Sequence, residues 1–141
     1  MVKTTLKWQG DLRFTGVSDK GFETPLDGDK ASAPSPMDVL LEAVGGCTGI
    51  DVVLILKKMR VEFDKLDVVI TGERNDTDPK FYNQILAQFD LQGDVTGDKL
   101  ARAINLSFEK YCSVFHSLRK DLVLLTEYRI NGGEWVRISQ A

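Results

Sequence analysis

The stretch from Pro36 to about Met59 is apolar on every side of the helix that it would form. At 1.5 Å per residue, this helix would be about 35 Å long. A helix that is apolar all round must be buried all round, and one sheet from a chain of 141 residues covers only one side of it. We therefore predict that a second copy of the chain covers the other side, in a homodimer.

The predicted start of this helix is marked by Ser35, Pro36 and Asp38. A serine hydroxyl can accept a hydrogen bond from an early backbone N–H, and proline at the first helical position gives up a donor that has no partner there. The carboxylate of Asp38 adds negative charge where the helix dipole favours it. These three residues predict that the helix begins at Pro36.

The middle of the same helix contains the run Gly45-Gly46-Cys47-Thr48-Gly49, with three glycines in five residues. Each glycine costs a helix about 1 kcal/mol relative to alanine. Two interpretations remain open: the helix is kinked here, or small residues allow another backbone or a ligand to come close. Either interpretation places Cys47 at a special position.

Apolar and polar residues alternate with a period of two on both sides of this helix, as in half-buried strands. We predict a hairpin around a turn at 9–11, a loop at 27–35, antiparallel strands at 66–71 and 85–91, a helix from Thr96, a short helix after Cys112, and strands at 122–130 and 135–138. This order of elements predicts an α+β fold built on antiparallel sheets. We expect one domain over residues 1–141.

The composition excludes several classes of protein. Lys and Arg total 18 against 21 Asp and Glu, so the net charge is −3, and no basic surface is available for nucleic acid or for anionic lipid. The first residues lack an apolar core followed by a cleavage site. Asp38, Glu42 and Asp51 interrupt the most apolar stretch and would be costly in a bilayer. We therefore expect a cytoplasmic protein without a nucleic-acid or membrane partner.

The chain has two cysteines, Cys47 and Cys112, which lie 65 positions apart. Such spacing is neither a dense disulfide framework nor a zinc pattern, so we expect no metal and no cofactor. Both cysteines fall at predicted helix breaks, where exposed N–H groups stabilise a thiolate. Asp51, four residues after Cys47, would oppose a thiolate there. The alternative is that both cysteines are inert, buried small residues.

The single histidine, His116, lies four residues after Cys112 and would share its face of a continuing helix. A Cys–His pair can act as a nucleophile with its base. The alternative is a partly buried histidine with a structural hydrogen bond. The acidic runs at 27–29 and 76–78 are interpreted as solvated turns.

Two segments carry a resemblance to a known family. The run from Pro36 to Thr48, with its Gly-Gly-Cys-Thr sequence, and the later run from Glu109 to Val114, with its Tyr-Cys-Ser-Val sequence, resemble the two cysteine motifs of the OsmC/Ohr family. These are the osmotically inducible and organic-hydroperoxide-resistance proteins. The resemblance covers nearly the whole chain. It implies an intertwined homodimer with long central helices between the sheets and an active site at the subunit boundary.

The resemblance also implies a chemistry. In members that act as thiol peroxidases the first cysteine, here Cys47, attacks an organic hydroperoxide and becomes a sulfenic acid. The second cysteine, here Cys112, then forms a disulfide with it, which an external dithiol reduces. On this basis we expect a hydroperoxide reductase of the oxidative stress response.

This sequence departs from the family pattern at two positions. Pro25 stands where active members have an arginine, and Met37 stands where they have a glutamate after the helix-opening proline. The chain therefore resembles an OsmC-like branch without this charged pair, although Arg13, Arg60 or Arg119 could replace the arginine. The alternative function is a homodimer without peroxidase activity that binds a small apolar or thiol ligand at the subunit interface.

Overall fold

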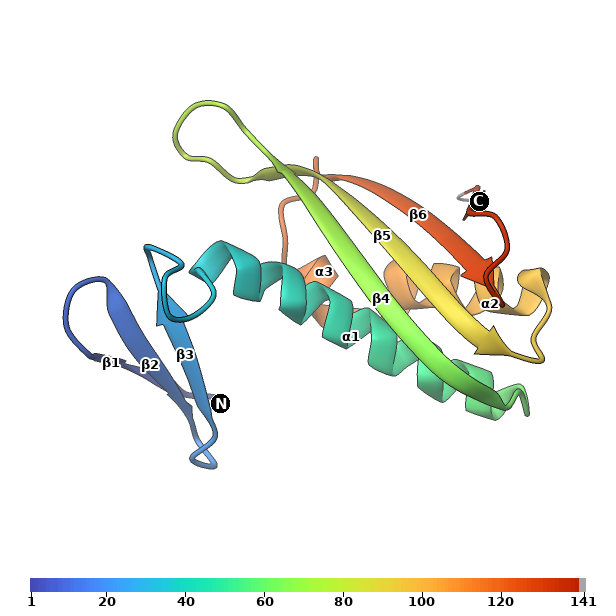
Figure 1. Ribbon diagram of the computed structural model, residues 1–141, viewed down its shortest axis with the longest axis horizontal. Helices are drawn as coiled ribbons and strands as arrows, with labels where there is room; N and C mark the ends of the chain where they lie inside the picture. The colour runs from blue at the N-terminus through green and yellow to red at the C-terminus, as the bar shows by residue number, and fades with distance from the viewer. Residues whose placement is uncertain (140–141) are drawn as a thin grey trace. The chain divides into compact units, whose positions relative to one another are not determined.

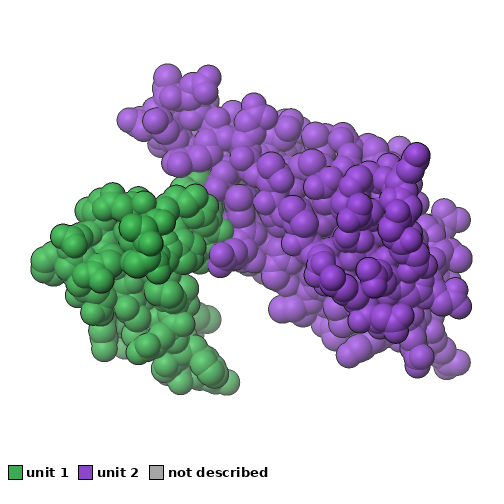
Figure 2. All heavy atoms as spheres, in the orientation of Figure 1, with its two compact units in different colours: residues 1–40 green, residues 41–141 purple. Residues whose placement is uncertain are grey.

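The structure, a computed structural model, describes residues 1–139 and has an α+β fold. These residues form two compact units, one of residues 1–40 and one of residues 41 onward (Figure 2). Each unit is described by itself below. The expectation of one domain over the whole chain stays a prediction.

The first unit is a three-stranded antiparallel sheet of β1 (Thr4–Trp8), β2 (Arg13–Ser18) and β3 (Glu23–Asp27), in that order. The predicted hairpin is confirmed, because Trp8 pairs with Phe14 across the turn. Pro25 lies in β3 opposite Thr15. β3 is an edge strand, where the missing N–H of a proline can be tolerated.

Asp27, at the end of β3, corrects the interpretation of 27–29 as a solvated turn. Its side chain is buried and accepts hydrogen bonds from the backbone N–H groups of Asp29, Ala31 and Ser32, at 2.9, 3.2 and 3.0 Å. The Ser32 hydroxyl donates a fourth bond at 2.9 Å. The bond from the Asp29 N–H is the largest of the effects that lower the pKa of Asp27. The carboxylate thus organises the loop before the long helix, whereas 76–78 is an exposed turn as predicted.

The long helix α1 (Pro36–Lys58) begins where the sequence predicts. The Ser35 hydroxyl accepts from the Asp38 N–H at 3.2 Å, and the Asp38 carboxylate accepts from the Ser35 N–H at 3.1 Å. This reciprocal pair is a capping box, which satisfies donors that the first turn leaves free.

The glycine run does not interrupt α1, which is helical from Pro36 to Lys58. Gly45 allows close packing on a strand, whereas a Cβ at Gly46 would meet nothing within 4 Å. A Cβ added at Gly45 would lie 3.0 Å from Cγ1 of Ile70, and one added at Gly49 would lie 3.5 Å from Cγ2 of Val68. Cys47 therefore lies within a continuous helix, and not at the helix break that the sequence suggested.

The second unit contains the sheet β4-β5-β6-β7, formed by β4 (Phe63–Arg74), β5 (Tyr82–Gly93), β6 (Val123–Ile130) and β7 (Val136–Arg137) (Figure 1). β4 and β5 are antiparallel, as predicted. β5 and β6 are parallel, which the sequence analysis did not anticipate. The reason is the long connection between them, because parallel neighbours need a crossover segment rather than a tight turn.

That connection consists of α2 (Gly97–Leu106), the π-helical turn η1 (Ser107–Tyr111) and α3 (Ser113–His116). Thr96 caps α2 as predicted, accepting from the Lys99 N–H at 3.3 Å. The π turn ends with a bond of 2.7 Å from the Cys112 N–H to the Ser107 carbonyl. Cys112 is then extended (φ −71°, ψ 93°) and precedes α3, so the predicted break at this cysteine is confirmed.

The core of the second unit lies between the sheet and the helices. α1 contributes one stripe, in which every fourth residue is buried: Val44, Thr48, Val52 and Leu56. β5 and α2 contribute the remaining centre of the core: Ala87, Phe89, Leu91, Leu100, Ala103 and Ile104. Within the second unit, the residues that the structure describes leave the opposite face of α1 exposed, since Ile50 is 64% and Leu54 is 53% exposed. α1 is long and apolar enough to cross a membrane, a test that core helices of soluble proteins also pass.

Gly72 in β4 supplies a test of this packing. A Cβ there would lie 2.4 Å from Cε1 of the buried Tyr82 ring and 3.1 Å from Cδ2 of Leu41. We expect Gly72→Ala to lower the free energy of unfolding by about 1–3 kcal/mol, because overpacking forces these groups apart. Urea unfolding measures the change, and the matched control is Gly16→Ala in β2, where a Cβ meets nothing closer than 3.4 Å. Equal losses in both variants would contradict the packing described.

Candidate functional site

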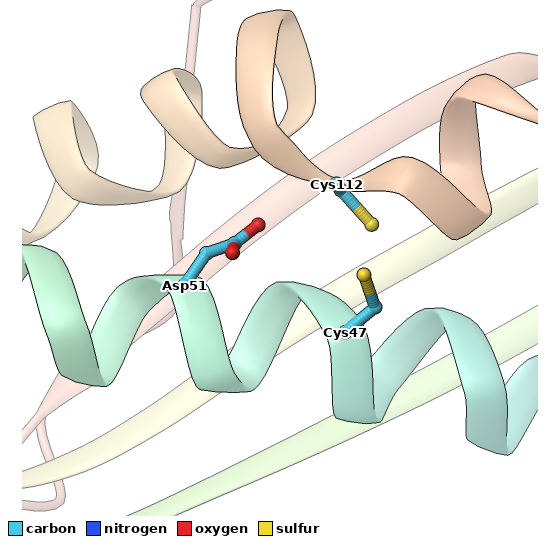
Figure 3. Close-up of side chains that lie close together, drawn as sticks. All are labelled: Cys47, Asp51 and Cys112. Carbon is cyan, nitrogen blue, oxygen red and sulfur yellow. The ribbon is translucent and has the colours of Figure 1, made fainter.

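The structure brings the two cysteines together. Cys47 lies on α1, and Cys112 lies between η1 and α3, with their sulfur atoms pointing toward each other (Figure 3). The two sulfur atoms and a carboxylate oxygen of Asp51 all lie within 4.8 Å of one another. Both cysteines are free thiols. The candidate site is therefore a dithiol with a carboxylate beside it.

Asp51 is near Cys47 because residues four apart lie on the same face of a helix. Its position is supported by a buried hydrogen-bond chain. The Ser107 hydroxyl donates to Oδ2 of Asp51 at 2.8 Å, and the hydroxyls of Thr48 and Ser107 are 2.8 Å apart. Because Ser107 uses its only hydroxyl hydrogen toward Asp51, Thr48 donates to Ser107. Thr48 and Ser107 are fully buried, so this chain holds the carboxylate and joins α1 to η1.

The two thiols have different environments. Cys47 is half-buried, whereas Cys112 is fully buried. Burial raises the pKa of the Cys112 thiol to about 12, the Phe115 N–H acts against this rise, and the neighbouring Cys47 and Asp51 add to it. Burial removes water from the side chain. The charged thiolate depends on that water more than the neutral thiol does, so burial favours the neutral form. The expectation that a helix start lowers the pKa of Cys112 is therefore wrong.

Two cationic side chains lie near Cys112 in the sequence, Lys110 and Arg119, and both contact groups other than the thiol. The ammonium of Lys110 lies 5.3 Å from the centre of the Tyr111 ring. Arg119 pairs with Asp121 and lies 3.6 Å from the centre of the Phe81 ring. Neither cation is among the groups that shift the pKa of Cys112. The guanidinium of Arg119 is thus paired with Asp121 rather than with Asp51 beside the cysteines.

The ring of His116 contacts a backbone carbonyl and an aromatic ring. Its Nε2 lies 2.8 Å from the carbonyl oxygen of Phe108. A carbonyl only accepts, so Nε2 carries the proton and donates. The ring also packs edge-on against Phe115, with centroids 5.9 Å apart. The structural alternative for His116 accounts for these contacts, and the hydrogen bond joins α3 back to η1 rather than to a thiol.

Sequence reasoning missed Thr48 and Ser107 as parts of this site. Each is a hydroxyl residue on the apolar face of its helix: Val44 and Val52 lie four residues before and after Thr48, and Ala103 lies four residues before Ser107. A polar residue on a buried helix face is expected to have a partner, and this was the available signal. The identity of that partner, 59 residues away along the chain, follows only from the fold.

Comparison with known proteins identifies the family. The family model described as OsmC-like protein matches residues 28–127. Protein YhfA of Escherichia coli K12 is 38% identical over 131 residues, covering 92% of this chain and 98% of YhfA. The chain therefore belongs to the OsmC-like family, as its cysteine motifs predicted.

Solved structures agree with this assignment. A hypothetical protein from Aquifex aeolicus VF5 has a TM-score of 0.85 at 29% identity, covering 95% of this chain and 98% of that one. The organic hydroperoxide resistance protein OhrB of Bacillus subtilis has a TM-score of 0.63 at 16% identity, covering 92% and 98%. The second likeness establishes a shared fold.

The buried Cys112 thiol makes a prediction about stability at high pH. Its pKa rises from an ordinary value of 9.0 to about 12 on folding. The unfolded chain therefore loses this proton first, and the stability present below pH 9 decreases as the pH rises toward 12. We expect the unfolding free energy to fall between pH 9 and 11 more steeply in the protein than in Cys112→Ala, by up to about 1.4 kcal/mol per pH unit.

Urea unfolding of both proteins under a thiol reductant measures this difference, since titration of Lys and Tyr is common to both. Parallel slopes would contradict the assigned environment of Cys112.

Proposed function

We propose that this protein is a thiol-dependent organic hydroperoxide reductase with Cys47 as the peroxidatic and Cys112 as the resolving cysteine. The observation that carries the proposal is the placement of the two sulfur atoms, which face each other within 4.8 Å. Membership of the OsmC-like family supports it, as does the fold shared with an organic hydroperoxide resistance protein. The proposed location is the cytoplasm, where thiols are kept reduced.

The first step takes place at Cys47, because its half-buried side chain is the more accessible of the two. Its thiolate attacks the terminal peroxide oxygen, and the O–O bond breaks. The sulfur is oxidised to a sulfenic acid, and the alkoxide takes a proton and leaves as an alcohol.

The second step uses Cys112. Its sulfur attacks the sulfur of the Cys47 sulfenic acid, the S–O bond breaks, and the hydroxyl leaves with the Cys112 proton as water. The sulfur atoms must close from within 4.8 Å to the disulfide length of about 2.0 Å. An external dithiol then restores both thiols by exchange and is itself oxidised to a disulfide.

A second function is favoured by the charges at the site. Asp51 lies beside the sulfur atoms and adds to the rise in the pKa of Cys112, so the carboxylate works against a thiolate. Pro25 lies in β3 at the position matched to the family arginine. These features favour a homodimer that binds a small apolar or thiol ligand at the subunit interface without reducing peroxides.

Both functions include a homodimer, which the uncovered face of α1 supports. A groove of about 430 Å³ runs beside this face. Its lining is mostly apolar and includes Gly46, Gly49, Ile50, Val53 and Leu54 of α1 and Leu66 and Val68 of β4. Gly46, where an added Cβ would meet nothing within 4 Å, leaves room for another backbone to approach closely. A second copy of α1 is the proposed occupant, since a bilayer would penalise the acidic side chains of Glu42 and Asp51.

Steady-state reduction of cumene hydroperoxide with a lipoyl dithiol tests the enzymatic proposal. We expect Cys47→Ser to have only the uncatalysed rate, because it lacks the sulfur that is oxidised. Cys112→Ser should accumulate a sulfenic acid at Cys47 that dimedone traps. His116→Gln is the matched control and should turn over within about twofold of the unmodified protein, since the ring bonds a carbonyl.

Equal turnover by the unmodified protein and Cys47→Ser would refute the reductase. The ligand-binding function would then require a small molecule that raises the melting temperature, because a ligand that binds the folded state stabilises it. A screen of apolar compounds and thiols without such a rise would count against that function.

Sedimentation at micromolar concentration tests the homodimer. We expect a dimer for the unmodified protein and a monomer for Leu54→Glu, because a charge would be buried without a partner. Val69→Glu is the control: Val69 is 49% exposed, and alternation along β4 places it on the face opposite to Val68. A monomeric unmodified protein, or dissociation by both variants, would contradict the proposed interface.

A further inference from the structure

The cluster at the two cysteines has a property that the reductase chemistry does not use. It combines two thiol sulfurs and one carboxylate oxygen, all within 4.8 Å of one another. Among residues 1–139, no Lys, Arg or His forms an ion pair with Asp51. Three groups that can each carry negative charge are therefore gathered without a cationic side chain paired to the carboxylate.

We propose that Cys47, Cys112 and Asp51 form a binding site for one Zn²⁺ ion in the reduced protein. Thiolate sulfur and carboxylate oxygen are both common zinc ligands. Thiolates also bind Cu⁺, but a carboxylate in the donor set favours zinc over that softer ion. On binding, each thiol gives up its proton to solvent.

The distances fit a zinc site after a small adjustment. With Zn–S bonds of about 2.3 Å and Zn–O bonds of about 2.0–2.2 Å, tetrahedral donor atoms lie about 3.4–3.8 Å apart. The present upper limit of 4.8 Å therefore leaves about 1 Å to close. Small side-chain rotations supply this, and Figure 3 shows the three side chains directed from both sides toward one gap.

The surroundings of Asp51 match what metal sites provide around their ligands. Ligating carboxylates are commonly hydrogen-bonded by a second layer of residues, which orients them. Here the Ser107 hydroxyl donates to Asp51 at 2.8 Å, and the Thr48 hydroxyl lies 2.8 Å from Ser107. Both hydroxyl residues are fully buried, so the carboxylate is held in place before any metal arrives.

The site supplies three protein ligands, and zinc prefers four. Cys47 and Asp51 are only partly buried, so water can reach the fourth position. Three protein ligands and one water form an open zinc site, in which another ligand can replace the water. The sequence spacing gave no sign of this site, because the cysteines are 65 positions apart.

The test is titration of the reduced, metal-free protein with Zn²⁺ in competition with a chromophoric chelator. We expect one Zn²⁺ per chain and a binding constant at least tenfold weaker in Asp51→Asn. Cys47→Ser and Cys112→Ser should lose competitive binding. Ser107→Ala keeps all three ligands and should weaken binding about tenfold, the usual effect of removing a supporting contact. Glu42→Gln, an exposed carboxylate on the same helix, is the matched control and should bind as tightly as the unmodified protein.

A second readout is independent of the chelator. Bound Zn²⁺ should slow alkylation of both cysteines in the unmodified protein, and Cd²⁺ should produce an ultraviolet sulfur-to-metal band that each serine variant weakens. Melting curves of the metal-free variants show whether Asp51→Asn folds. If it does not fold, the zinc affinity of Ser107→Ala is the measurement that tests the site.

The proposal is overturned if the reduced protein does not compete for Zn²⁺, or if Asp51→Asn and Ser107→Ala both bind with unchanged affinity. Peroxide turnover is measured separately in metal-free buffer. Loss of turnover without loss of zinc binding, or the reverse, therefore distinguishes failure of one proposal from failure of the other.

Discussion

The close packing of α1 on β4 is the contact on which the rest of the second unit depends. Gly45 lets the helix backbone approach Ile70 closely, and Gly49 lies next to Val68. This approach turns the stripe through Val44 and Val52 into the core. Glycine destabilises an isolated helix. This destabilisation is offset only where packing of the helix against the strand contributes more stability than the glycine removes. The same orientation of α1 directs Cys47 and Asp51 toward the η1–α3 junction (Figure 3).

The site is assembled by two kinds of local geometry. The helical repeat brings Asp51 next to Cys47. The π turn of η1 ends at Cys112, which is extended before α3 begins and whose sulfur points toward Cys47 on α1. The buried chain from Thr48 through Ser107 to Asp51 links the two. The two thiols of this site are unequal, because Cys47 is partly accessible and Cys112 is buried. This inequality gives each cysteine a separate role in the proposed reaction.

Several expectations from the sequence were confirmed because they depend on neighbours in the chain. The capping box at Ser35 and the Thr96 cap involve residues three apart. Other expectations were wrong because burial, which the sequence pattern did not reveal, decided the outcome. Asp27 is buried by its own loop rather than solvated, and burial outweighs the helix start in setting the pKa of Cys112. The parallel pairing of β5 and β6 depends on the path of the whole connection between them.

The sequence by itself determined most of the helix and strand segments, the family and the two cysteines of the candidate site, since these follow from periodicity, caps and motifs within short stretches. Only the tertiary structure decided that Cys47, Cys112 and Asp51 form one cluster, that two hydroxyls support it, and that one face of α1 stays exposed among residues 41–139. The physical reason is that burial and through-space distance set the charge and reactivity of these groups. Neither quantity is encoded by spacing along a chain in which the cysteines are 65 residues apart.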